Sequence, residues 1–393
     1  MKVAIPKERR PGESRVAASP DTVKRFVGLG LEVVIETGAG TASAILDSDY
    51  AAVGAKIAPD EAATLADAEI VLKVRRPLLA GEEGVQEGED ELRLMKPGTC
   101  LAAILDPYDT RDIIPRYAEA GINAFAMELM PRITRAQVMD VLSSQSNLAG
   151  YKAVLDAAAE FGRTFPMMMT AAGTVPAARV MIMGAGVAGL QAIATARRLG
   201  AIVSATDVRP ASKEEVQSLG ATFVAVEDEE FQQAQTAGGY AKEMSDAYKK
   251  KQADLIAETI KKQDIVICTA LIPGRPAPTL ISEDMVKTMK QGSVIIDLAV
   301  ERGGNCPLSQ PGKVVEKHGV KIVGHLNVAG RLPAAASLLY AKNLFSFISP
   351  FVDKETGTLK INWDDEVITG TALTRDGKVV HPQFAEAPAE AST

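Results

Sequence analysis

Three glycines at a fixed spacing carry the strongest chemical signal in the sequence. Gly184, Gly186 and Gly189 lie in the segment GAGVAG, directly after an apolar run and directly before an alanine-rich helical stretch. In such a unit the first glycine permits a tight turn, the second lets backbone approach a pyrophosphate, and the third lets the helix pack on the strand. Amides at the helix start then face the phosphate charge. We predict that these glycines and Val187 bind a dinucleotide.

An acidic residue at the end of the next apolar run indicates which dinucleotide binds. Asp207 lies about 20 residues beyond Gly184 and can accept hydrogen bonds from both hydroxyls of an adenosine ribose. Its charge would repel the extra phosphate of NADP(H), so the site formed with Val208 favours NAD(H). Arg209 argues the other way, because arginine near such a site can bind phosphate. In the alternative interpretation, Asp207 only caps the helix at 210–219 and the glycines only turn the chain.

Two further loops are candidates for contacts with this dinucleotide. The segment before the apolar run at 265–268 is longer than a crossover helix needs and includes Gly239 and Tyr240. We interpret it as a lid that carries Tyr240; the alternative is a disordered loop with an incidental tyrosine. The second loop, TALIPGRPAP, follows the run at 265–268. Its residues Ala270 and Leu271 are therefore expected at the carboxyl end of the sheet, beside the dinucleotide.

A polar stretch before the glycine-rich region is the candidate site for the nicotinamide. Residues 130–146 (MPRITRAQVMDVLSSQS) combine Arg132, Arg135, Gln137, Asp140 and several serines, a density of polar groups that is unusual for a linker. We predict that Arg132 and Gln137 form hydrogen bonds with the carboxamide or the pyrophosphate side of the nucleotide. Asp140 is predicted to fix Arg132.

Short apolar runs that alternate with helical stretches must position these residues. They predict an α/β fold with two Rossmann-like, doubly wound domains, whose mostly parallel sheets are joined by long helices. The predicted strands are 3–5, 33–35, 70–74, 100–104, 124–126, 179–183, 202–206, 222–226, 265–268, 294–297 and 321–323. The predicted helices include 20–29, 147–161, 190–199, 243–262 and 333–348.

A chain of 393 residues is longer than one hydrophobic core usually supports, so two domains are expected. We place the first at 1–142 together with 332–382, because the turns and short strands after the last helix return to it. The second, dinucleotide-binding domain is placed at 143–331. Residues 383–393, rich in alanine, proline and glutamate, are expected to be disordered.

Composition excludes several classes of function. The formal net charge of -7 disfavours binding to nucleic acid or anionic lipid. No stretch approaches 18 uninterrupted apolar residues and no signal peptide is recognisable, so neither direct membrane insertion nor export is expected. The three cysteines and three histidines show no spacing typical of metal sites or disulfides, so we expect no metal and a reducing compartment. Methionines 167–169 are expected to fill a core.

Taken together, these stretches resemble the NAD(H)-binding component of proton-translocating nicotinamide nucleotide transhydrogenase, in the superfamily that it shares with alanine dehydrogenase. The resemblance covers residues 1–382 and rests on PKERRPGESRVA, AMELMPRITRAQ, MDVLSSQSNLAGY, MMMTAAGTVPAARV, GAGVAGLQAIATARRLGA, TDVR, TAGGYAKEM, TALIPG and VIIDLAVERGGNCP. It implies that Arg132, Gln137, Asp140 and Ser143 surround the nicotinamide. It also implies that Tyr240 lies on a mobile loop that folds over the bound nucleotide.

The resemblance also implies an activity. Hydride would pass directly between NADH bound on this chain and NADP(H) bound on a partner component, coupled to proton translocation by a transmembrane component. Such a transfer needs no nucleophile or general acid, only two nicotinamide rings held within about 3 to 3.5 Å at an open edge. A homodimer is implied as well, in the cytoplasm and peripheral on the inner face of the cell membrane through its partner subunits.

Two other functions stay open at this point. The first is a soluble enzyme similar to alanine dehydrogenase, because Arg15 and Lys73 match the substrate-binding arginine and lysine of that enzyme. Asp106, however, stands where its histidine would fall and Glu301 replaces its aspartate. Losing the acid-base group disfavours oxidative deamination. The second is a non-catalytic NAD(H)-binding regulator.

Overall fold

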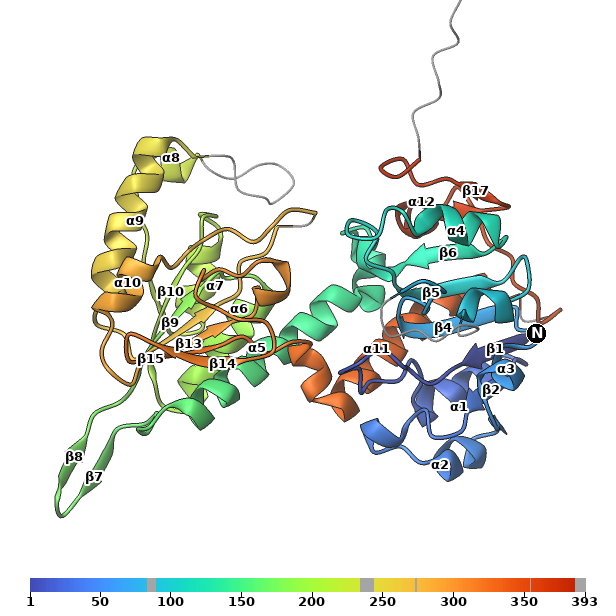
Figure 1. Cartoon of the computed structure of the whole chain (residues 1–393), viewed down its shortest axis with the longest axis horizontal. Coiled ribbons are helices and arrows are strands. Elements are labelled where there is room, and N and C mark those ends of the chain that lie inside the picture. Colours follow the sequence, from blue (N-terminus) through green and yellow to red (C-terminus); the bar gives the residue numbers. More distant parts are fainter. Residues whose placement is uncertain (83–89, 234–243, 273, 354, 386–393) are drawn as a thin grey trace, which may run out of the picture. The chain divides into compact units, whose positions relative to one another are not determined.

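The computed structural model describes residues 1–82, 90–233, 244–272, 274–353 and 355–385, and the chain divides into two compact units. Unit 1 comprises Met1–Gln145 and Gly330–Thr393, and unit 2 comprises Ser146–Ala329. Each contains a large, mostly parallel sheet with helices on both faces (Figure 1). The prediction of two Rossmann-like α/β domains is confirmed.

The sheet of unit 1 has six strands in the order β3-β2-β1-β4-β5-β6, and every neighbouring pair is parallel. This is the doubly wound order, in which the chain reverses direction across the sheet between β1 and β4. The strands are β1 (Lys2–Ile5), β2 (Glu32–Glu36), β3 (Lys56–Ala58), β4 (Ile70–Arg75), β5 (Cys100–Ile104) and β6 (Asn123–Ala126).

Alternation of side chains along these strands builds two cores in unit 1. Val3 and Ile5 of β1 pack on one face with Phe26 and Leu344 from two helices, whereas Ala4 faces the other core. The helices are α1 (Pro20–Gly28), α2 (Asp47–Ala52), α3 (Glu61–Leu65), α4 (Ile114–Glu119), α11 (Pro333–Ile348) and α12 (Glu366–Thr371). A two-stranded ribbon, β16 (Thr374–Arg375) and β17 (Lys378–Val379), follows α12.

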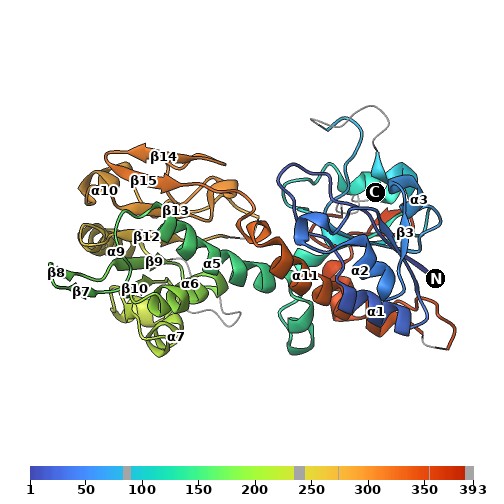
Figure 2. The ribbon, with the colours of Figure 1, turned by 90° about the horizontal axis from the view of Figure 1, so that it is seen from below.

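The sheet of unit 2 repeats this order with one added strand. It runs β11-β10-β9-β12-β13-β15-β14, parallel except for the pair of β14 with β15, and reverses between β9 and β12 (Figure 2). Dinucleotides bind such sheets beyond the carboxyl ends of the strands, at the point of reversal. The strands are β9 (Arg179–Met183), β10 (Ile202–Thr206), β11 (Thr222–Phe223), β12 (Ile265–Cys268), β13 (Val294–Asp297), β14 (Val314–Lys317) and β15 (Val320–Val323).

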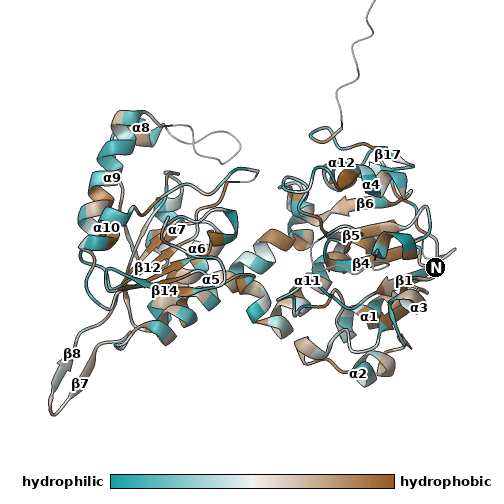
Figure 3. Ribbon diagram, in the orientation of Figure 1, coloured by the Kyte–Doolittle hydropathy of each residue, from teal (hydrophilic) through white to brown (hydrophobic). Residues whose placement is uncertain are grey.

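The central strands of the unit 2 sheet, β9, β12 and β13, are apolar on both faces, as the brown strands of Figure 3 show. Ile182 packs with Val154 and Ile193 on one face, and Met181 packs with Ile256 on the other. The helices are α5 (Val141–Glu160), which begins in unit 1, and α6 (Val187–Arg198), α7 (Ser212–Ser218), α8 (Glu229–Gln232), α9 (Asp246–Ile260) and α10 (Glu283–Thr288). Continuous apolar runs of this kind are typical of buried parallel strands.

One expectation about the core of unit 2 is wrong. Met167, Met168 and Met169 do not fill a core: they are 60%, 44% and 79% exposed, on and beside a two-stranded hairpin of β7 (Met168–Thr170) and β8 (Gly173–Val175). A two-stranded ribbon that does not join a larger sheet has no core of its own to cover its side chains. The sequence shows only three consecutive apolar residues, a pattern that does not reveal that they lie on an exposed hairpin.

Candidate functional site

The predicted glycine turn lies at the carboxyl end of β9, where the sheet of unit 2 reverses. Gly184 has a φ of +102°, which side chains rarely permit, and Gly189 lies so close to it that an added Cβ would be 1.8 Å from the Gly184 carbonyl oxygen. Gly186 differs: an added Cβ would meet nothing within 4 Å. The first and third glycines thus serve the turn and the packing of α6, while the second faces open space in front of the first turn of α6, where Val187 is exposed.

Asp207 follows β10, next to this turn, and its carboxylate already has four hydrogen-bond donors. Oδ2 accepts from the Ala185 amide at 2.7 Å and from Nη2 of Arg209 at 3.0 Å. Oδ1 accepts from the amide and Nε of Arg209 at 2.8 and 2.9 Å. A carboxylate offers about four acceptor positions. Ribose hydroxyls must therefore displace the Arg209 guanidinium to use it.

The loop after β12 completes the polar and apolar surroundings of the turn. Ala270 is half-buried, whereas Leu271 is 52% exposed and Ile272 is 45% exposed. Because β9, β10 and β12 are parallel neighbours, the residues that follow them share one edge of the sheet. Val208 is also exposed at this edge. The structure thus brings the described residues of the predicted dinucleotide site together.

The loop predicted to form a lid is not part of the described structure. Gly239 and Tyr240 lie outside the described residues, and the helix predicted at 243–262 is described from Asp246 to Ile260 as α9. Residues 386–393 of the predicted disordered tail also lie outside.

The residues predicted to surround the nicotinamide belong to unit 1. Arg132 and Gln137 are exposed, the latter on a short 3-10 helix, Thr134–Met139. Asp140 directly precedes α5, and its carboxylate accepts hydrogen bonds from the amide and the hydroxyl of Ser143. These contacts make Asp140 an N-cap of α5. Its predicted link to Arg132 stays a prediction.

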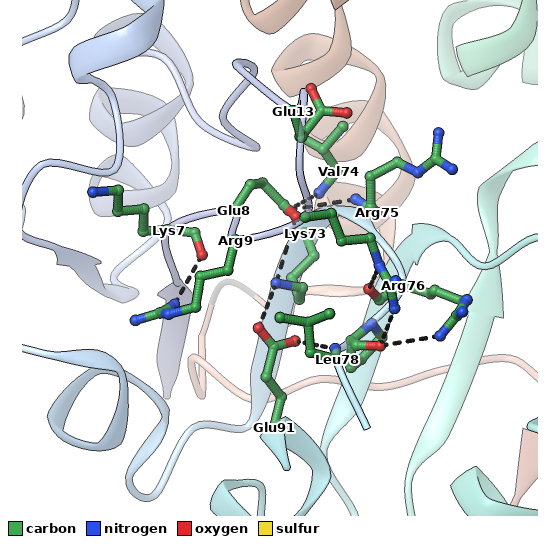
Figure 4. Close-up of polar contacts among 12 residues, drawn as sticks. Lys7, Glu8, Arg9, Glu13, Lys73, Val74, Arg75, Arg76, Leu78 and Glu91 are labelled. Carbon is green, nitrogen blue, oxygen red and sulfur yellow. Dashed lines mark hydrogen bonds and ion pairs between the residues drawn. The ribbon is translucent and has the colours of Figure 1, made fainter. Parts of the chain in front are cut away.

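Buried charges fill the point of reversal in the sheet of unit 1. Figure 4 shows Lys73, on β4, between Glu91 and Glu8, with its Nζ atom 3.1 and 3.6 Å from their carboxylates. Burial alone would lower the pKa of Lys73, but these carboxylates raise it above its ordinary value. Arg15 is 4% exposed and pairs with Glu13 at 2.7 Å. Both cations are therefore neutralised within the chain.

Asp106 and Glu301, which the resemblance matched to the acid-base groups of alanine dehydrogenase, lie in different units. Asp106 follows β5 with a φ of +51° and pairs with Arg75 at 3.2 Å. Its amide and that of Leu105 donate to the carboxylate of Glu128. Glu301 lies beyond β13 and accepts from the Asn327 amide at 3.1 Å.

The carboxyl group of Glu128 should make the stability of unit 1 depend on pH. Burial, with the charge of Asp106 beside it, raises the pKa of Glu128 from 4.5 to about 7. The folded chain therefore holds a proton that the unfolded chain releases, so this stabilisation is present below pH 4.5 and is lost as the pH rises through about 7. Glu128→Gln should remove about 1 to 3 kcal/mol of this pH dependence.

Urea unfolding followed by the fluorescence of Trp363 tests this in unit 1, because Trp363 is the sole tryptophan and stacks on Phe125. Glu119→Gln on the exposed surface of α4 is the matched control and should retain the wild-type slope. An unchanged pH dependence in Glu128→Gln would contradict the assignment.

Neither a membrane span nor a metal cluster is found in the described portion of the chain. No helix there is long and apolar enough to cross a bilayer. No group of three or more histidine, cysteine, aspartate or glutamate side chains there could hold a metal ion.

Three residues near the glycine turn were missed by the sequence analysis. Gly150 of α5 allows the start of α6 to pass so closely that an added Cβ would lie 2.0 Å from the Ala188 carbonyl oxygen. Thr269 and Asn305 form hydrogen bonds with the loops around the turn. A glycine inside a helical pattern signals such a close approach. For Thr269 and Asn305 only the resemblance, through TALIPG and VIIDLAVERGGNCP, marked the segments.

These features define a two-domain protein of the dinucleotide-binding class, with a glycine turn in one domain and neutralised charges in the other. The chain belongs to the alanine dehydrogenase/PNT family: the model of its N-terminal domain matches residues 4–149 and that of its C-terminal domain matches 153–382. The resemblance to transhydrogenase inferred from the sequence is confirmed.

Individual relatives agree with this assignment. The chain is 60% identical over 382 residues to the first segment of the NAD(P) transhydrogenase alpha subunit of Rhodospirillum rubrum, and the match covers 97% of this chain and 98% of that one. It is 30% identical to an alanine dehydrogenase of Halomonas elongata, over 98% of this chain and 96% of the relative. The solved transhydrogenase of Sinorhizobium meliloti matches with a TM-score of 0.86 and 55% identity, over 97% of this chain and all of that one.

Proposed function

We propose that this chain is the NAD(H)-binding subunit of a proton-translocating transhydrogenase. NADH would bind at the carboxyl edge of β9, β10 and β12 and pass hydride to NADP+ on a partner component. The observation that carries the proposal is the open space at Gly186 beside Asp207, at the point of reversal of the sheet. The name of the Rhodospirillum rubrum relative, an alpha subunit, supports a multi-subunit enzyme.

The proposal extends to assembly and location. The chain is proposed to form a homodimer and to lie in the cytoplasm, bound to the inner face of the cell membrane through an NADP(H)-binding component and a transmembrane component. Because the hydride donor and acceptor rings must come within about 3 to 3.5 Å, the NADH-bound chain must leave its nicotinamide accessible to the partner. Arg132, Gln137, Asp140 and Ser143 are proposed to orient the ring.

An alanine dehydrogenase activity is the alternative that the family membership keeps in view. A carboxylate substrate at Arg15 and Lys73 would have to displace Glu13 and Glu91, each within 3.1 Å of the cation that it neutralises. Breaking a buried ion pair is costly, which disfavours this substrate. Asp106 stands at the position of the histidine in alanine dehydrogenase, but its carboxylate is paired with Arg75 and is therefore a poor substitute for that acid-base group.

One assay separates the three candidate functions. The chain is mixed with an NADP(H)-binding component, and hydride exchange from NADH to an NAD analogue is followed through bound NADP(H). The chain alone is then tested with alanine and NAD+. Exchange only with the partner supports the proposal, oxidation of alanine supports the alternative, and NADH binding with neither activity indicates a regulator.

Substitution of Asp207 and substitution of Arg209 are expected to affect NADH affinity differently. Asp207→Ala removes the acceptor proposed for the ribose hydroxyls, and hydrogen bonds to a charged group contribute about 1.5 to 3 kcal/mol. We expect NADH affinity to fall about 10- to 100-fold and the preference over NADPH to shrink. Arg209→Ala frees the carboxylate from its competitor, so NADH affinity should not fall. Calorimetric titration of both variants with NADH and NADPH measures this, and weaker NADH binding by Arg209→Ala would contradict it.

A further inference from the structure

Hydrogen bonds to Asp297, the last residue of β13, hold the loop that follows this strand against the strand's end. Its carboxylate is 1% exposed and accepts from the amides of Ala299, Asn305 and Cys306 at 3.0 to 3.1 Å. The Ser309 hydroxyl donates to it as well, at 2.6 Å. Four donors on one buried carboxylate fix this loop, because each would lose a strong, charge-assisted hydrogen bond if the loop moved.

Asn305 connects this loop to the neighbouring strand. Its side chain is fully buried, and its Oδ1 atom accepts from the Ala270 amide at 3.2 Å. Its Nδ2 atom donates to the carbonyls of Ala270 and Pro278, at 2.9 and 2.8 Å. The two carbonyls lie near the beginning and the end of the loop that leaves β12. One side chain therefore ties down both ends of that loop.

Thr269 connects the same loop to the glycine turn. Its hydroxyl lies 3.0 Å from the Gly184 carbonyl oxygen and 3.3 Å from that of Met183. It also occupies the space that a side chain on Gly184 would need, at 2.6 Å from the added Cβ. Asp297, Asn305 and Thr269 thus form a series of contacts: Asp297 holds the backbone of Asn305, Asn305 holds the loop after β12, and Thr269 in that loop contacts the turn after β9.

We propose that Asn305 is a positioning residue for the nucleotide, which it affects through the loop at 269–272 and 274–278. This inference rests on the proposed NAD(H) site. Because Asn305 engages both the amide and the carbonyl of Ala270, that amide is not available to the nucleotide. The exposed side chains of Leu271 and Ile272, which follow Ala270 directly, are the part of this loop that NADH is expected to contact.

Calorimetric titration with NADH tests the role of Asn305. Asn305→Ala should weaken NADH binding at least about tenfold, at a temperature where circular dichroism shows the chain folded. Asn305→Asp keeps an acceptor for the Ala270 amide but sets a charge against two carbonyls, so it should not restore affinity. Asn123→Ala, which removes a buried asparagine of unit 1, is the matched control: it should lower the thermal midpoint and leave NADH affinity unchanged.

Thr269→Val keeps the shape of the side chain without its hydroxyl and serves if Asn305→Ala fails to fold. It should also weaken NADH binding, and the double variant should lose less than the product of the two single effects, because both break one series of contacts. A lower thermal midpoint with wild-type NADH affinity in Asn305→Ala and in Thr269→Val would overturn the inference alone. A wild-type chain that binds no NADH would overturn the proposed function with it.

Discussion

Gly189→Ala should destabilise unit 2 and abolish NADH binding. The added Cβ would lie 1.8 Å from the carbonyl oxygen and 2.9 Å from the carbonyl carbon of Gly184. These are backbone atoms of the turn itself, so α6 would have to move away from β9. Overpacking of this kind costs about 3 kcal/mol or more where backbone cannot yield. The turn proposed to bind the pyrophosphate would be displaced at the same time.

Gly186→Ala is the matched variant, with a different expected result. The added Cβ would meet nothing within 4 Å, and the φ of -75° suits alanine. Stability should therefore be kept or rise by up to about 1 kcal/mol. The methyl group would nevertheless occupy the space where the pyrophosphate is proposed to approach the backbone. We expect NADH affinity to fall on the order of 100-fold with no loss of stability.

Two signals measure this pair of variants separately. Thermal unfolding followed by circular dichroism reports on both units, whereas the fluorescence of Trp363 reports on unit 1 and should be the same in both variants. Calorimetric titration gives the NADH affinity. Wild-type affinity in Gly186→Ala, or wild-type stability in Gly189→Ala, would contradict the roles assigned to these glycines.

The central strands and the best-capped helices could be predicted from sequence because their signals are local. β5 and β12 are uninterrupted apolar runs, and both were predicted with the bounds that the structure has. α1 begins at Pro20, and the hydroxyl of its N-cap residue Ser19 accepts a hydrogen bond from the amide of Thr22. α11 begins at Pro333 as predicted; its N-cap residue Leu332 forms no side-chain hydrogen bond, and the signal here is the proline at the first helical position. Such caps and apolar runs need no knowledge of the tertiary fold.

Two edge strands, β3 and β14, were not predicted, whereas the edge strand β6, which is buried along its length, was. β3 has three residues and pairs only with β2, and β14 is largely exposed and pairs only with β15. The β7–β8 hairpin, absent from the predicted strands, lies outside both large sheets. In each of these strands, exposed side chains replace the continuous apolar run that marks a buried strand.

The candidate site likewise has parts that a local sequence signal predicts and parts that only the tertiary fold reveals. The glycine turn was readable because its spacing is a local signal, and the structure places it beside Asp207. That Arg209 fills this carboxylate could not be read, since arginine two residues away can turn in several directions. Asn305 and Ala270 are 35 residues apart, and only the pairing of β12 with β13 brings them together. Contacts across neighbouring strands need the topology first.

Gln137→Ala is expected to slow hydride transfer on the order of 100-fold while changing NADH affinity little, because displacement of a reacting ring by about 1 Å can cost this much. The loop that carries Gln137 should stay in place without its side chain. Its neighbours Ala136 and Met139 are buried, and the Val138 carbonyl accepts from Nδ2 of Asn343 at 2.8 Å. The variant therefore removes an orienting group and leaves the backbone that presents it.

Arg135→Gln is the control for this loop, since its exposed guanidinium pairs with Asp365 at 2.6 Å and has no proposed role in orienting the ring. It should transfer hydride at the wild-type rate. Single-turnover transfer to the NADP(H)-bound partner gives the rate, and calorimetry gives the NADH affinity. A rate that falls only in proportion to affinity would mean that Gln137 contributes uniform binding to ground and transition states. A wild-type rate would mean that the ring is oriented from elsewhere, so the separation of rate from affinity decides whether this loop aligns the nicotinamide.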